Sequence, residues 1–211
     1  SEWRSTLAFV HIQTGDYDEA IKESQKAFQL AVEADELYLQ RRAKHLTGLA
    51  YVRNNSLIQA EQTAWELKKF IDEGSHKNSI RLFHHLWGEI ELKKRNYPEA
   101  IDSFQKSVSL ALYQSNPLFS SSLAQAYYLA GQHKKAQEEY TKIPDFRSGI
   151  KGYGDMIIKS YYMLGIVLQE LGQKEDAIQN YEKFLTLWID ADPGLPEVED
   201  AKKRLAGLKG Q

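Results

Sequence analysis

The stretch YYMLGIVLQELGQKEDAIQNYEKF, residues 161–184, decides the fold of this chain of 211 residues. Its small residues Gly165 and Ala177 lie twelve positions apart, and Tyr181 and Phe184 follow the alanine at spacings of four and seven. Such spacings place side chains on one face of a helix. Small residues let helices approach closely, since a larger side chain would overpack at a cost of about 1 to 3 kcal/mol. The stretch therefore predicts two packed helices joined by a tight turn.

The same arrangement occurs four more times along the chain. Its alanine returns in GDYDEAI, SLIQAEQ, NYPEAID and QHKKAQE, and the successive separations of all five alanines are 40, 40, 36 and 41 residues. A small residue stands twelve positions before each one. A period of roughly 20 to 50 residues indicates stacked repeats, so we predict an all-α solenoid of about five helix pairs. The ten repeat positions are Ala8, Ala20, Gly48, Ala60, Gly88, Ala100, Ala124, Ala136, Gly165 and Ala177.

One domain over 1–211 is the expected organisation, because a solenoid grows by adding units that contact their neighbours. Asp192, Pro193 and Pro196 break the last repeat. An amphipathic capping helix is then expected over 196–209, where it would cover the open apolar end of the array. The repeats themselves are expected at approximately 1–35, 38–74, 78–114, 117–146 and 154–190.

These positions resemble the tetratricopeptide repeat (TPR), a helix-turn-helix unit with a small residue in each helix and an aromatic residue in the second. The likeness is weaker in repeats one and two, where Ser24 and Ala64 replace the aromatic residue, and the units exceed the family's usual length of about 34 residues. Residues 147–208, with GDMIIKSYYMLG, YEKFLTLW and DADPGLPEVEDAKKRL, are similar to the end of TPR regions in bacterial multidomain, often kinase-associated, signalling proteins. The resemblance implies a right-handed solenoid that acts as a scaffold, with any enzymatic activity outside this chain.

In the TPR architecture, the first helix of each pair lines a concave face. The resemblance implies that residues three before, one after and four after its small residue look inward and bind a peptide. Exposure is expected above all for His45, His85, Glu89, Tyr128 and Tyr162, whereas packing between helices is an equal alternative for the aliphatic positions. The expected groove residues are His45, Leu49, His85, Glu89, Gln125, Tyr128, Tyr162 and Ile166.

Composition and motifs argue against several other functions. The net charge is −2 and both signs are spread along the chain, which does not make the basic stripe of a nucleic-acid surface. Cysteine is absent, which excludes thiolate metal sites. His45 and His85 occupy equivalent places in consecutive repeats, but two imidazoles without a third ligand rarely hold a metal. The glycines of 148–155 follow no strand and indicate a loop rather than a phosphate site. We therefore expect no enzyme, cofactor or metal.

The function that the sequence favours is a scaffold holding a protein or peptide segment in its groove. A groove that senses a small signalling ligand is the alternative, and homo-oligomerisation stays open. No apolar run approaches the roughly 18 residues of a membrane span, and no secretory signal is present, so we expect a cytoplasmic protein. The chain begins Ser-Glu-Trp without a methionine, which also fits a piece of a longer protein.

Overall fold

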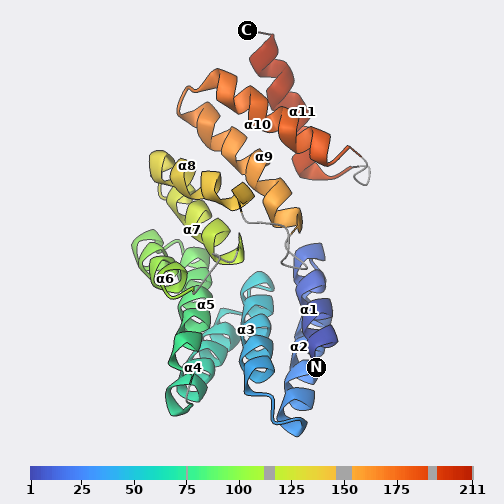
Figure 1. The fold of residues 1–211 in the computed structure, drawn as a ribbon, viewed down its shortest axis with the longest axis vertical. Coiled ribbons are helices and arrows are strands. Elements are labelled where there is room, and N and C mark those ends of the chain that lie inside the picture. The colour runs from blue at the N-terminus through green and yellow to red at the C-terminus, as the bar shows by residue number, and fades with distance from the viewer. Residues whose placement is uncertain (75, 112–116, 146–153, 190–193, 211) are drawn as a thin grey trace. The chain divides into compact units, whose positions relative to one another are not determined.

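The computed structural model describes residues 1–74, 76–111, 117–145, 154–189 and 194–210 (Figure 1). These residues form eleven α-helices and two short 3-10 helices, with no strand among them, and the expected all-α array of helix pairs is confirmed. The helices are α1 (Glu2–Thr14), α2 (Tyr17–Glu33), α3 (Leu37–Arg53), α4 (Leu57–Glu73), η1 (Lys77–Ser79), α5 (Ile80–Lys93), α6 (Tyr97–Ser109), α7 (Pro117–Leu129), α8 (His133–Lys142), η2 (Ile143–Asp145), α9 (Gly154–Glu170), α10 (Lys174–Leu187) and α11 (Pro196–Lys209).

Two compact units make up the chain, Ser1–Tyr113 and Gln114–Gln211. The first contains the helix pairs α1–α2, α3–α4 and α5–α6, and the second contains α7–α8, α9–α10 and the capping helix α11. Within the first unit, α3 packs against α1, α2 and α4, and α5 packs against α3. A single domain over 1–211 stays a prediction. Most of the glycine-containing loop predicted at 148–155 lies outside the described residues.

The turn inside each helix pair has one recurring geometry. The residue five positions before each repeat alanine has a positive φ between 61° and 85°. In each turn, the next amide donates a hydrogen bond to the carbonyl five residues back, for example from Asp16 N to His11 O at 2.9 Å. This is the Schellman arrangement that ends helices. The five turn residues are Gly15, Asn55, Arg95, Gly131 and Gly172.

All ten small repeat positions are buried, and the three glycines among them lie against side chains of neighbouring helices. A Cβ added at Gly48 would lie 2.3 Å from a methyl carbon of Leu86. At Gly88 and Gly165, the nearest atoms would be aromatic carbons of Phe104 and Tyr181, at 2.6 and 2.7 Å. Each glycine therefore gives an aliphatic or aromatic side chain of a neighbouring helix room to pack against the backbone.

None of the helices in the described part of the chain is both long and apolar enough to cross a bilayer.

Candidate functional site

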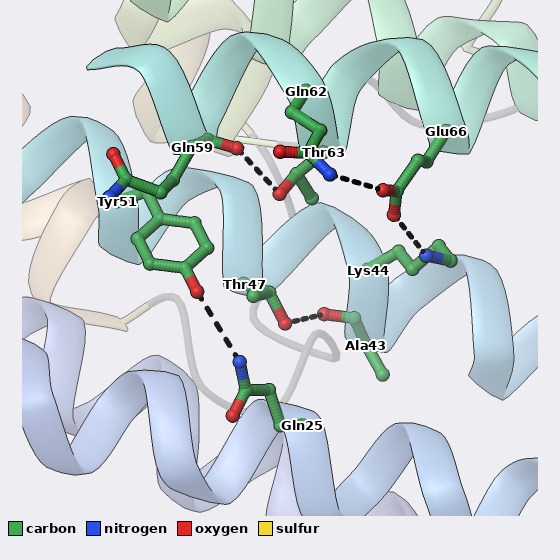
Figure 2. Close-up of polar contacts among 9 residues, drawn as sticks. All are labelled: Gln25, Ala43, Lys44, Thr47, Tyr51, Gln59, Gln62, Thr63 and Glu66. Carbon is green, nitrogen blue, oxygen red and sulfur yellow. Dashed lines mark hydrogen bonds and ion pairs between the residues drawn. The ribbon is translucent and has the colours of Figure 1, made fainter. Parts of the chain in front are cut away.

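A groove in the first unit lies between α2 and α4, with α3 as its floor, and we call it the α2–α4 groove (Figure 2). It encloses a volume of about 330 Å³. Most of its side chains end in amide or hydroxyl groups, which come from all three helices. The groove is lined by Gln25, Phe28, Gln29, Lys44, Thr47, Tyr51, Gln59, Gln62, Thr63 and Glu66.

The floor of the groove is formed by side chains one helical turn apart on α3. Thr47 is buried, and its hydroxyl oxygen lies 2.8 Å from Oγ of Ser24 and 3.0 Å from the carbonyl oxygen of Ala43. Gln25, from α2, points toward Tyr51 and donates a hydrogen bond from Nε2 to its hydroxyl oxygen at 3.3 Å (Figure 2). Because a phenol can also donate, the proton of Tyr51 stays available to a bound group.

An ion pair closes one side of the groove between α3 and α4. Nζ of Lys44 lies 2.9 Å from Oε2 of Glu66, and Nε2 of Gln62 donates to Oε1 of the same carboxylate at 3.1 Å (Figure 2). The hydrogen bond from Lys44 lowers the pKa of Glu66, so the carboxylate is charged near neutral pH. Lys44 also lies 4.8 Å from the centre of the Phe28 ring. The two charges balance each other, and the lining has no net charge.

Two glutamines at the rim of the groove, Gln29 on α2 and Gln59 on α4, are exposed. Neither side-chain amide has a hydrogen-bond partner among the described residues. An amide side chain carries two donors on nitrogen and an acceptor oxygen, which is also the pattern that the peptide group needs in a partner. The groove therefore offers uncharged donors and acceptors from both of its walls.

Three residues expected to be exposed, His45, His85 and Glu89, are buried, and that expectation is wrong. They lie between α3 and α5, the first helices of consecutive pairs, which pack against each other and leave 3% or less of each residue exposed. Nε2 of His45 lies 2.9 Å from Nδ1 of His85. Oε1 of Glu89 lies 3.7 Å from Nε2 of His85, and Oε2 lies 3.0 Å from the guanidinium of Arg53.

Both imidazoles in this cluster are held in the neutral form. Burial lowers the pKa of His85 to about 3, and the charge of Arg53 acts in the same direction. Burial and the His85 ring lower the pKa of His45 well below its usual range. Since Nε2 of His85 faces the Glu89 carboxylate, we assign its proton to Nε2, which makes Nδ1 the acceptor for His45. The pair is part of the packing, and no group of three or more metal-binding side chains occurs among the described residues.

The other predicted groove residues have mixed environments. Leu49 and Ile166 are buried, whereas Gln125, Tyr128 and Tyr162 are half-buried. Contact of any of them with a partner stays a prediction.

The capping helix contacts Tyr162 directly. The Tyr162 hydroxyl donates to Oδ2 of Asp200, on α11, at 2.8 Å, and Nε of Arg204 contacts the same oxygen at 2.5 Å. Burial, together with the hydrogen bond to Asp200, raises the pKa of Tyr162. In the second unit, α11 therefore covers part of the face that we expected to be open to a peptide.

Sequence reasoning missed the α2–α4 groove because it searched the first helices only. Seven of the ten lining residues come from the second helices of two pairs, and the signal was a run of polar side chains at helical spacing. On α4 these are Gln59, Gln62, Thr63 and Glu66.

The chain matches two family models, both described as tetratricopeptide repeat. One covers residues 5–34 and 158–187, and the other covers residues 85–149. Together they span more than half of the chain. None of the curated proteins compared with the chain matches it.

Several solved structures have a similar fold. BtubC (BKLC) from P. vanneervenii has a TM-score of 0.71 at 10% identity, over 91% of this chain and 82% of its own. A signal transduction ATPase with numerous domains and a tetratricopeptide repeat sensor, from Pyrococcus horikoshii, has a TM-score of 0.65 at 18% identity, over 97% of this chain and 31% of its own. The TPR2AB domain of yeast Sti1, in complex with pHSP90, has a TM-score of 0.51 at 12% identity, over 99% and 85%. At these identities, the similarity concerns the fold.

Proposed function

The chain belongs to the tetratricopeptide repeat family, and from that premise we propose that it is an interaction module that holds a segment of a partner protein in the α2–α4 groove. Tetratricopeptide repeats generally mediate protein–protein interaction. The observation that carries the proposal is the groove itself, with unpaired amides on both walls and no net charge.

The chemistry of the lining suits a polypeptide backbone. Peptide groups carry one N–H donor and one carbonyl acceptor per residue, and each loses free energy when it leaves water without a partner. Gln29 and Gln59 face the groove from opposite walls, and the Tyr51 hydroxyl offers a donor at the floor. An extended segment lying along the groove would find partners for its backbone without any charged contact.

We further propose that the module is the scaffold or regulatory region of a larger bacterial protein. The Pyrococcus protein is a signal transduction ATPase with numerous domains and a tetratricopeptide repeat sensor, and 31% of its chain aligns with this one, which supports a place in a multidomain context. The Sti1 domain is in complex with pHSP90, which supports the choice of a protein partner.

A small signalling ligand is the second candidate. Ligand pockets enclose roughly 300 to 1,000 Å³, and the volume of about 330 Å³ reaches the lower end of that range. A compact polar molecule would therefore also fit the groove.

Selection from a random peptide library displayed on phage tests the proposal. Peptides selected on the natural chain should lose binding to a Gln29→Arg, Gln59→Arg variant, because two long cations would enter the groove from its rim. Both positions are exposed, so the variant should keep its fold, as checked by circular dichroism. Gln179→Arg, at another exposed glutamine, on α10, is the control and should leave binding unchanged. Equal binding to the groove variant would contradict the proposal, and selection of no peptide would favour the small ligand.

A further inference from the structure

The repeat register places an equivalent groove between α4 and α6 over α5, and there the chain itself supplies a cluster of aromatic rings, of which Trp65 is 53% exposed. The ring centres of Trp65 and Trp87 lie 5.3 Å apart, and those of Trp65 and Phe83 lie 5.5 Å apart. Phe83 and Trp87 stack at 5.9 Å. Trp65 belongs to α4, and the other two rings belong to α5.

Equivalent residues of the two grooves lie 40 positions apart in the sequence. Gly48 and Gly88 are 40 residues apart, as are Ala60 and Ala100, so positions separated by 40 residues occupy equivalent places in consecutive pairs. Forty residues before the three rings stand Gln25, Ala43 and Thr47. Gln25 and Thr47 line the α2–α4 groove, and Ala43 lies in the turn of α3 before Thr47. The α2–α4 groove thus corresponds by register to the place that the indoles of Trp65 and Trp87 occupy one repeat later.

We propose that the α2–α4 groove accepts an aromatic side chain, an indole above all, from the bound segment, an inference that rests on the proposed function. Thr47 is smaller than Trp87, its equivalent one repeat later, and leaves open the space that the Trp87 indole takes there. Rings of the protein already line it, since Phe28 and Tyr51 belong to the lining. Offset and edge-to-face contacts between aromatic rings stabilise more than their buried area alone.

The charges and hydrogen-bonding groups of the groove favour an uncharged ring. Lys44 and Glu66 neutralise each other, so neither is left to pair with a charged side chain of the partner. Burial of an unpaired charge is costly, whereas an indole carries only one N–H that needs an acceptor. The amide oxygen of Gln25, whose nitrogen already donates to Tyr51, and the amide of Gln59 provide acceptors at the groove.

Titration with N-acetyl-L-tryptophanamide, followed by the amide signals of a ¹⁵N-labelled chain, tests the inference. Saturable shifts are expected in the side-chain amides of Gln25, Gln29, Gln59 and Gln62. N-acetyl-L-leucinamide should bind roughly tenfold more weakly, because it lacks the ring contacts. Equal binding of the two compounds, or shifts outside the groove only, would overturn the inference.

Two reciprocal variants sharpen the test. Thr47→Trp copies the next repeat and should fill the groove with the chain's own indole, so binding of the tryptophan amide should be lost. Ser24 loses its contact with Thr47 in this variant but keeps its hydrogen bond to the carbonyl of Ile21. Trp87→Thr should instead open the next groove and raise the number of sites from one to two. Unchanged binding to the first variant and an unchanged number of sites in the second would each count against the inference.

The outcomes separate this inference from the proposed function. If selected peptides bind the groove but contain no aromatic residue, and the tryptophan amide does not bind, the inference fails while the proposed function stands. If the tryptophan amide binds but no peptide is selected, the aromatic site stands and the protein segment as occupant fails.

Discussion

Acidification should destabilise the first unit through the buried pair His45 and His85. The two rings join α3 to α5 by a hydrogen bond of 2.9 Å and are almost inaccessible to water. Positive charge is disfavoured there by burial, and Arg53, Arg42 and Arg81 add to the effect. Glu89 acts in the opposite direction on His45. The folded chain therefore resists protonation at a pH at which the unfolded chain accepts protons.

The magnitude follows from linkage. An unfolded histidine has a pKa of about 6.5, whereas the pKa of His85 in the folded chain is about 3. The stability is therefore complete above about pH 6.5 and falls as the pH drops toward 3, where the folded chain also takes up the proton. At pH 5, one and a half units below the unfolded pKa, the loss is about 2 kcal/mol for a histidine that stays neutral when folded. The depressed pKa of His45 adds a loss of the same sign.

Urea unfolding at pH 8, 6.5 and 5 measures this loss. A Trp188→Phe background leaves three tryptophans, all in the first unit, so that their fluorescence reports this unit alone. The matched variant is His45→Gln, His85→Asn, because glutamine keeps a donor near Nε2 and asparagine keeps an acceptor near Nδ1. Between pH 8 and pH 5, the free energy of unfolding should fall by at least about 2 kcal/mol more with the histidines than without them. Equal losses in the two proteins would refute the reasoning.

Three further predictions concern the repeat geometry and the capping helix. Gly165→Ala should lower the free energy of unfolding by about 1 to 3 kcal/mol in urea titrations, because its Cβ would meet an aromatic ring of α10 at 2.7 Å. As a control, Gly207→Ala should raise the free energy of unfolding by about 0.5 to 1 kcal/mol, because this helical position has open space around it. Arg95→Gly should raise the melting temperature and stabilise by up to about 1 kcal/mol, since φ is 64° at this position; a lower melting temperature would contradict the strain argument. Tyr162→Phe should speed hydrogen exchange in α11, because it removes the bond to Asp200, and unchanged exchange would show that this hydrogen bond does not contribute to holding the helix.

The fold could be predicted from the sequence because it depends on a few positions that tolerate little variation. Even the Cβ of an alanine at Gly88 or Gly165 would collide with an aromatic ring, and residues with positive φ recur five positions before each repeat alanine. Such positions are visible in the sequence as small residues, with glycine or asparagine at four of the five turns, at a period of 36 to 41 residues. Exposure could not be predicted in the same way. The spacing of His45 and His85 placed them in equivalent repeat positions, but the approach of α3 to α5, which buries them, depends on the whole interface.

The candidate site was hidden from the sequence for a related reason. A repeat pattern shows what consecutive repeats share, whereas the α2–α4 groove exists because two consecutive repeats differ. At Gln25 and Thr47 the first unit has polar side chains of modest size, and 40 residues later it has Trp65 and Trp87 in contact. Neither pair is unusual on a helix surface by itself. The difference acquires meaning only when the shared backbone register is known, because one pair then fills a groove that the other leaves open. In a repeat protein, departures from the common pattern at equivalent positions are therefore where a binding site is best sought.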